Sequence, residues 1–157
     1  MAVQPVDYEL GAGARFVAGA GSTPGAGLHA GVVSSMADGL TVRVVRNDAM
    51  TLIEIIGDLD MSNVERLQAV FDELHVGDKS VVVVSFELCT YCDSTGLGRL
   101  VRLSNRIAPQ LRVVVPKMSS IRRVFDITGL SIHLGVFDSF DDASVGIPVR
   151  AIWRKAL

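Results

Sequence analysis

Residues 80–98, with the sequence SVVVVSFELCTYCDSTGLG, decide the fold of this chain. The four valines at 81–84 predict a strand buried on both faces, because β-branched side chains favour sheets and an unbroken apolar run leaves no wet face. A polar loop is expected to follow this strand. From Ser94 to Ile107 the apolar residues recur every three or four positions and predict a helix. The sequence therefore places a serine hydroxyl at the first turn of a helix, just beyond a central strand.

This position makes Ser94 a candidate phosphorylation site. The first turn of a helix has N–H groups without intrahelical partners and carries the positive end of the helix dipole. Such a helix end favours an added anion, and a phosphoryl group brings about −1.5 to −2 charges. The alternative is structural, because serine is a common helix cap. Asp93 is expected to cap the same helix, and both interpretations of Ser94 stay open.

Strands and helices alternate along the rest of the chain. The predicted strands cover residues 41–45, 51–57, 81–84, 110–115 and 131–136. Helices are predicted after a capping box formed by Ser62 and Glu65, and from Ser94 onward. A third helix is predicted after Ser119 or Ser120, with Ile121, Val124 and Phe125 facing inward, and a fourth from Ser139. A closing helix is predicted with Val149, Ile152, Trp153 and Ala156 on one face. The alternation predicts a single α/β domain with a mixed, mostly parallel sheet, an N-terminal β-hairpin and helices packed against the sheet.

Length and composition limit the classes of function that are compatible with this chain. A chain of 157 residues with 49% hydrophobic and 20% charged residues is typical of one globular domain. Its net charge of −2 gives no overall field that would attract nucleic acid or a membrane, and neither is expected as a direct partner. No Ser-His-Asp set, metal cluster or nucleotide loop is recognisable, so we expect neither an enzyme nor a bound cofactor. The N-terminal residues lack the pattern of a secretory signal, which predicts a cytoplasmic protein.

The N-terminal residues differ from the remainder in composition. Glycine and alanine dominate residues 11–31, and no helical or strand period is recognisable there. Residues 1–39 are therefore predicted to form a flexible tail. The folded domain is expected to span residues 40–157, including a C-terminal helical extension.

Cys89 and Cys92 form a C-x-x-C pair directly before Asp93. Thioredoxin-like redox chemistry places such a pair at a helix start, where the dipole lowers a thiol pKa. Cysteine also packs well as a small hydrophobic residue. Zinc would need further ligands, and the three histidines are scattered singly. Packing and a redox switch both remain open.

Several arginines follow Ser94 with helical spacing. Arg99, Arg102 and Arg106 would line one side of the predicted helix. They suit either a docking strip for an acidic partner or an ordinary solvated face. Arg122 and Arg123 raise the same two alternatives.

Three short stretches are similar to a known family. They are GDLD at 57–60, DSTGLG at 93–98 and RRVFDITGL at 122–130. Over about residues 41–145 the chain resembles STAS domains, named for sulphate transporters and anti-sigma factor antagonists, and in particular the small bacterial anti-anti-sigma factors. Ser85 departs from the common pattern, in which this strand often ends in an acidic or amide residue.

The resemblance implies a partner-switching regulator of transcription. In such proteins an anti-sigma factor with a histidine-kinase-like ATPase fold phosphorylates the first hydroxyl after the motif's aspartate, which is Ser94 here. The unphosphorylated form binds the anti-sigma factor and frees a sigma factor, and a phosphatase resets the switch. The predicted partner-binding residues are Asp60 and Asp93, implied by the resemblance, with Ser94, Thr95, Gly96 and Arg99 around them. The alternative is a soluble STAS subunit of a transporter complex or a stress-sensing scaffold, and a homodimer is left open.

Overall fold

The computed structural model describes residues 7–10, 14–18, 29–34, 39–46, 49–74 and 80–147. The strands in these ranges are β1 (Asp7–Leu10), β2 (Ala14–Ala18), β3 (His29–Ser34), β4 (Leu40–Arg46), β5 (Met50–Leu59), β6 (Val81–Cys92), β7 (Leu111–Val114) and β8 (Val136–Phe137). The helices are α1 (Val64–Asp72), α2 (Ser94–Ile107), α3 (Ser120–Ile127), α4 (Leu130–His133) and α5 (Phe140–Ala143). None of the described helices is long and apolar enough to cross a membrane.

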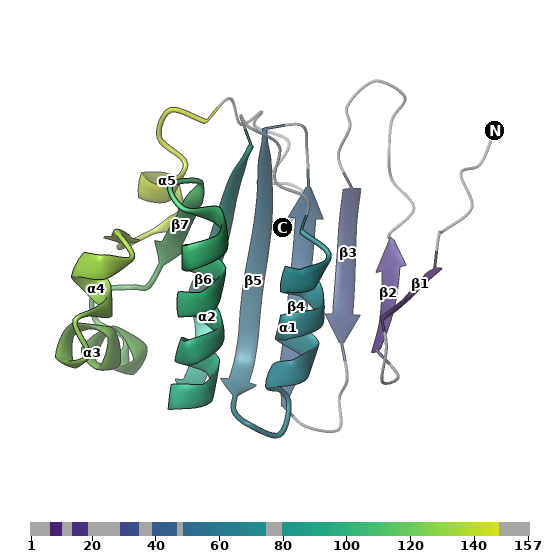
Figure 1. Cartoon of the computed structure of the whole chain (residues 1–157), viewed down its shortest axis with the longest axis horizontal. Coiled ribbons are helices and arrows are strands. Elements are labelled where there is room, and N and C mark those ends of the chain that lie inside the picture. The colour runs from purple at the N-terminus through teal and green to yellow at the C-terminus, as the bar shows by residue number, and fades with distance from the viewer. Residues whose placement is uncertain are drawn as a thin grey trace.

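In this described part of the chain the strands form one sheet whose order follows the sequence from β1 to β8 (Figure 1). Neighbouring strands from β1 to β5 pair antiparallel, and those from β5 to β8 pair parallel. From residue 40 onward, an antiparallel β4–β5 hairpin therefore leads into parallel strands. The predicted α/β class and its hairpin are confirmed.

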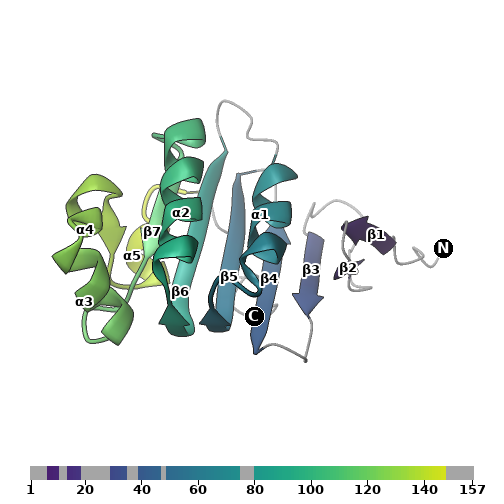
Figure 2. The ribbon, with the colours of Figure 1, turned by 60° about the horizontal axis from the view of Figure 1, so that its bottom comes forward.

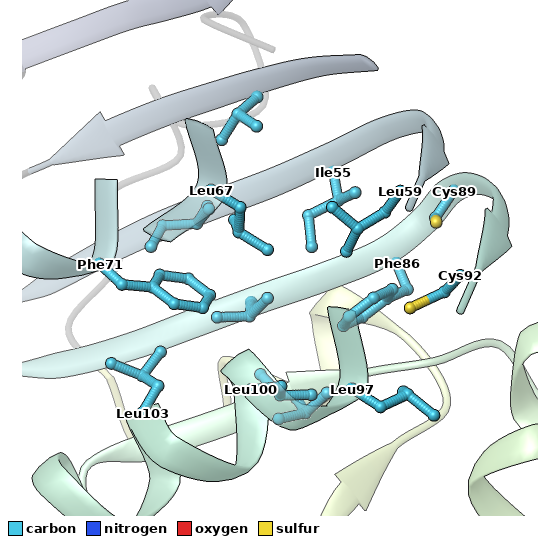
Figure 3. Close-up of a cluster of buried hydrophobic side chains, with 14 of the residues drawn as sticks. Ile55, Leu59, Leu67, Phe71, Phe86, Cys89, Cys92, Leu97, Leu100 and Leu103 are labelled. Carbon is cyan, nitrogen blue, oxygen red and sulfur yellow. The ribbon is translucent and has the colours of Figure 1, made fainter. Parts of the chain in front are cut away.

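Helices α1 and α2 cover one face of the sheet, and α5 packs on the other (Figures 1 and 2). Alternate residues of β6 serve the two layers. Val82 and Val84 join the cluster beneath α1 and α2, while Val83 packs in the cluster that contains Ala143 of α5. The prediction of a strand buried on both faces is confirmed. Figure 3 shows the larger cluster, in which leucine and phenylalanine side chains from α1 and α2 meet those of β5 and β6.

Strand β6 is longer than predicted, and the prediction of a polar loop after residue 84 is wrong. The strand continues to Cys92 and stays paired with β5 through two shifts in register. Phe86 continues the buried alternation, and its ring meets that of Phe125 in α3 edge-on, with the centroids 5.5 Å apart. β6 therefore carries the chain directly to the start of α2.

The capping box predicted for α1 is also wrong. Asn63 occupies the N-cap position, and its side chain does not bind the helix. The Ser62 hydroxyl donates to Asp60, and Glu65 accepts a hydrogen bond from Arg99 of α2. Because both side chains have partners outside the first turn, neither completes the reciprocal pair.

The region after β7 follows the predictions in part. Ser119 caps α3 by accepting a backbone N–H of the first turn, as predicted, but Val124 is exposed rather than facing inward. The strand predicted at 131–136 is wrong, since α4 precedes the short β8 there. Gly129 and Gly135, at φ 76° and 61°, reverse the chain on either side of this helical turn.

Strands β1, β2 and β3 lie in the segment where a flexible tail is predicted. β3 pairs with β4, so the sheet crosses the predicted domain boundary. In the β2–β3 pair, Phe16 and Val17 stand opposite Val33 and Val32. Aromatic and β-branched residues favour strands. Here they form short runs between glycines, so the overall glycine and alanine content of the segment did not indicate strands. The closing helix predicted over 149–156 lies outside the described residues.

Candidate functional site

Ser94 is the first residue of α2, at the edge of the sheet where β5 and β6 end. Asp93 precedes it as the N-cap, with an extended backbone at φ −89° and ψ 178°. One carboxylate oxygen of Asp93, Oδ1, accepts the N–H of Thr95 at 2.9 Å and that of Gly96 at 3.0 Å. Asp93 therefore satisfies two backbone donors of the first turn, and the capping role belongs to it rather than to Ser94.

Asp93 also fixes α2 to the neighbouring loop. Its other carboxylate oxygen, Oδ2, accepts the N–H of Met61 at 3.0 Å, and its own N–H donates to the carbonyl of Leu59 at 3.1 Å. The end of β5, the β5–α1 loop and the start of α2 are thus held together by one residue. This arrangement presents Ser94 on a fixed backbone.

The Ser94 side chain is exposed, and its hydroxyl has no hydrogen-bond partner among the described residues. Thr95, the adjacent hydroxyl, is half-buried. A phosphoryl group on Ser94 would therefore project into solvent without displacing an existing contact. It would meet the favourable dipole of α2 and the like charge of Asp93 together.

The β5–α1 loop carries the second predicted aspartate. The Ser62 hydroxyl donates to Asp60 at 2.6 Å and the Ser62 N–H at 2.8 Å. These two hydrogen bonds, of which the one from the hydroxyl has the larger effect, hold the pKa of Asp60 below its ordinary value, because they favour the charged carboxylate. The buried Asn63 stabilises the loop, since its amide donates to the Asp58 carbonyl at 2.9 Å and its side-chain oxygen accepts the Asp60 N–H at 3.0 Å.

Sequence reasoning missed Asn63 because Ser62 offered a better match to a capping motif. The signal that could have found it is the preference of asparagine side chains for nearby backbone groups in the loops before helices. It also missed two apolar side chains at this edge. Met61 is 77% exposed and Tyr91 is 53% exposed. Met61 is bonded to Asp93 and Tyr91 lies two residues before it, so both flank the polar groups of the site.

Gly96 lies under the site rather than on its surface. A Cβ atom added there would lie 2.7 Å from Cδ2 of Leu59 and 3.0 Å from Sγ of Cys92. The absence of a side chain therefore lets the first turn of α2 approach β5 and β6 closely. The structure brings Asp60, Asp93, Ser94 and Thr95 to one edge, with Gly96 buried behind them.

The arginines of α2 have different environments. Arg99 donates to Glu65 of α1 at 2.6 Å. Arg106 donates to the Phe71 carbonyl and lies 3.9 Å from a carboxylate oxygen of Asp72, both in α1. These two side chains therefore bridge the helices. Arg102 is exposed and has no ion-pair partner in the described ranges.

Arg122 has a structural environment as well. Its guanidinium donates to Asp126 at 3.2 Å, to Asp138 at 2.7 Å and to the Val115 carbonyl at 3.1 Å. The hydrogen bond to Asp138 is the main cause that raises the pKa of Arg122. This residue ties the end of β7 to α3 and to the segment after β8. Arg123, by contrast, is exposed.

Both cysteines are buried and free (Figure 3). The Cys89 thiol lies 3.1 Å from the Tyr91 carbonyl, to which it donates. Burial raises the pKa of Cys89 to about 11 and that of Cys92 to about 12. The thiolate is the reactive form, so these environments favour the packing interpretation at neutral pH. Among the described residues no three His, Cys, Asp or Glu side chains gather in a cluster that could hold a metal.

The chain also matches a family model, which is described as "Mlab, STAS domain". The match covers residues 42–135, more than half of the 157 residues. The chain belongs to the STAS domain family. The match begins in β4 and ends after α4, so it includes Asp60, Asp93 and Ser94. No curated protein sequence matches this STAS domain protein.

Solved structures share the fold of this STAS domain. An anti-sigma factor antagonist from Mycobacterium paratuberculosis is 20% identical with a TM-score of 0.63, and the match covers 74% of this chain and 100% of the other. The Bacillus cell fate determinant SpoIIAA in its phosphorylated form is 20% identical with a TM-score of 0.50, and the match covers 66% of this chain and 96% of the other. The STAS-like fold predicted from the sequence is therefore confirmed.

Proposed function

We propose that this STAS domain is an anti-sigma factor antagonist whose binding to a kinase-like anti-sigma factor is switched off by phosphorylation of Ser94. The exposed Ser94 hydroxyl carries the proposal, because it has no partner among the described residues and sits on a first helical turn fixed by Asp93. Two structures of the same fold support it, one an anti-sigma factor antagonist and the other a phosphorylated protein.

In the proposed cycle, the unphosphorylated edge docks on the anti-sigma factor and a sigma factor is released. The partner packs around the small Ser94 hydroxyl and the exposed Met61 and Tyr91 side chains. Anchors of this kind bind best when water is excluded around them. The chain acts in the cytoplasm by binding and performs no catalysis of its own.

Phosphorylation would then reverse the docking. The Ser94 oxygen forms a bond to the γ-phosphorus of ATP, the bond to ADP breaks, and the hydroxyl proton passes to a base of the kinase. The kinase supplies this base. The added charge must lose its water when the partner docks, and an unpaired buried charge costs several kcal/mol. Each ~1.4 kcal/mol is a tenfold change in affinity, and a phosphatase restores the binding form.

The fold is expected to survive the modification. A charge at an exposed helix N-terminus contributes roughly 0.3–1 kcal/mol of stabilisation, and repulsion from the adjacent Asp93 opposes it. The two effects offset each other, so the melting temperature of the phosphorylated protein should stay close to that of the unmodified one. The switch therefore acts at the surface and not by unfolding.

The decisive experiment titrates the purified anti-sigma factor with wild type, Ser94→Ala and Ser94→Glu. Ser94→Ala should bind like wild type, and Ser94→Glu should bind at least about tenfold more weakly. Asn105→Glu is the matched control, because it adds the same charge to an exposed position near the far end of α2. Incubation with the anti-sigma factor and ATP should place phosphate on Ser94, as mapped by mass spectrometry.

The proposal fails if Ser94→Glu and the enzymatically phosphorylated protein both bind as tightly as wild type. It also fails if Ser94→Ala is labelled as strongly as wild type. The first result would favour the scaffold or transporter role over the anti-sigma role, and the second would move the phosphorylation to another residue.

A further inference from the structure

The outer face of α3 has no role in the fold described so far. Ile121 and Phe125 point into the core from the opposite side of this helix. Ile127 is three positions from Val124 and four from Arg123, so it lies next to both, and all three side chains are exposed. Ile127 is 76% exposed and Val124 is also exposed.

Exposed aliphatic side chains also flank the helix before its start and after its end. Met118, just before the Ser119 cap, is 95% exposed, and Ile132 in α4 is 91% exposed. α4 packs against α3, and the Ser131 hydroxyl donates to Asp126 of α3. We call Met118, Arg123, Val124, Ile127 and Ile132 the α3 face. Single exposed aliphatic residues are ordinary, but a group of them on adjoining segments marks an interaction site.

The charges around the α3 face leave a small positive excess. Arg122 binds Asp126 and Asp138, at 3.2 and 2.7 Å, and its single positive charge balances one of the two carboxylates. Lys117 and Arg123 are exposed, and neither has an ion-pair partner within the described ranges. The surface that complements this face therefore combines carboxylates with aliphatic side chains.

The α3 face lies near the candidate site. α3 packs against β6, the strand that leads to Ser94, and the Phe125 ring contacts Phe86 of that strand. In Figure 2, α3 lies beside the end of β6. One partner of ordinary size can therefore cover the Ser94 edge and the α3 face together.

We propose that the α3 face is a second docking surface, which binds a segment of the anti-sigma factor with carboxylates beside aliphatic side chains. This inference rests on the proposed function, because it names the same partner. The α3 face does not include Ser94, so phosphorylation weakens one contact and leaves the other. A kinase held by the α3 face can then reach the Ser94 hydroxyl and still release the product edge.

The test measures the affinity of the purified anti-sigma factor for Ile127→Glu and Arg123→Glu, each made alone and together with Ser94→Glu. Ile127→Glu should weaken binding about tenfold, the effect of losing an interface anchor. Arg123→Glu should weaken binding severalfold and reduce its dependence on salt concentration. Because the two surfaces are separate, each factor should be similar with Ser94 intact and with Ser94→Glu.

Val145→Glu is the control, since this exposed valine follows α5 on the other face of the sheet. It should bind like wild type, and thermal melts should show that all variants fold. If the α3 variants bind like wild type while Ser94→Glu is weakened, the inference is overturned and the proposed function stands. If wild type does not bind the anti-sigma factor, both are overturned.

A membrane arm separates a lipid surface from a protein partner. Wild type is sedimented with phosphatidylcholine vesicles that contain phosphatidylserine. No co-sedimentation, together with weakened binding of Ile127→Glu to the anti-sigma factor, supports the inference. Co-sedimentation that Ile127→Glu abolishes, with anti-sigma binding unchanged, overturns it in favour of an anionic membrane.

Discussion

Alanine substitutions at Gly96 and Gly98 of α2 are expected to differ in their effect on the free energy of unfolding. Both glycines are in the same helix, and alanine is favoured over glycine there by up to about 1 kcal/mol. A Cβ at Gly98 meets no atom within 4 Å. Gly98→Ala should therefore stabilise the protein by up to about 1 kcal/mol.

At Gly96 the same methyl group meets a packed core. It would lie 2.7 Å from a methyl carbon of Leu59, which is fully buried, and 3.0 Å from the sulfur of Cys92. Forcing an extra carbon into such a site costs roughly 1–3 kcal/mol. The helix-propensity gain is shared by the two variants, so Gly96→Ala should be about 1–3 kcal/mol less stable than Gly98→Ala.

Urea unfolding followed by circular dichroism measures this difference directly, with equal m-values showing that both variants unfold from the same compact state. For a chain of this size, each kcal/mol corresponds to roughly 2–4 °C in melting temperature. If the two variants agree within about 0.5 kcal/mol, the close contact of α2 with β5 and β6 does not determine stability, and the reasoning is refuted.

Three further predictions concern the same edge of the sheet. Gly57 and Gly39 both have positive φ, at 91° and 73°, so alanine at either position should destabilise the protein by at least about 1–2 kcal/mol. Gly57→Ala should be the less stable of the two in urea unfolding, because only its Cβ would clash with a backbone oxygen, 2.0 Å away. Asp93→Ala should lose about 0.5–2 kcal/mol with its cap, and equal stability to wild type would contradict the role given to this carboxylate. The free energy of unfolding should fall as pH rises from about 8.5, the ordinary thiol pKa, towards 11, because Cys89 and Cys92 stay protonated in the folded protein but ionise when it unfolds. In the variant with both cysteines replaced by alanine, the free energy of unfolding should depend less on pH over that range.

The features that could be predicted from the sequence depend on local periodicity. The valines of β6 and the apolar spacing of α2 determine a buried strand followed by an amphipathic helix, whatever lies around them. The length of β6 was not predictable in this way. Its second half is stabilised by pairing with β5 through shifts in register, which depends on contacts between distant residues.

The site shows the same division. Asp93 as a cap and Ser94 in the first turn of α2 follow from the order of neighbouring residues, and the sequence predicts both. The buried position of Gly96 against Leu59 could not be anticipated, because Leu59 is distant in the sequence. Residues 131–136, with the sequence SIHLGV, alternate between polar or small and apolar side chains, a pattern typical of a strand. The chain nevertheless forms a helical turn there, flanked by Gly129 and Gly135 with positive φ.

The order of the sheet has a consequence for how the chain assembles. Each described strand pairs with the strand that precedes it in the sequence, from β1 to β8. During synthesis every new strand therefore finds its partner edge already made, and no early strand has to wait for a late one. Contacts between nearby segments shorten the conformational search, and domains that emerge N-terminus first profit from this order. The sheet can grow in one direction, with β6 and then α2 adding the Ser94 edge only after β5 is in place.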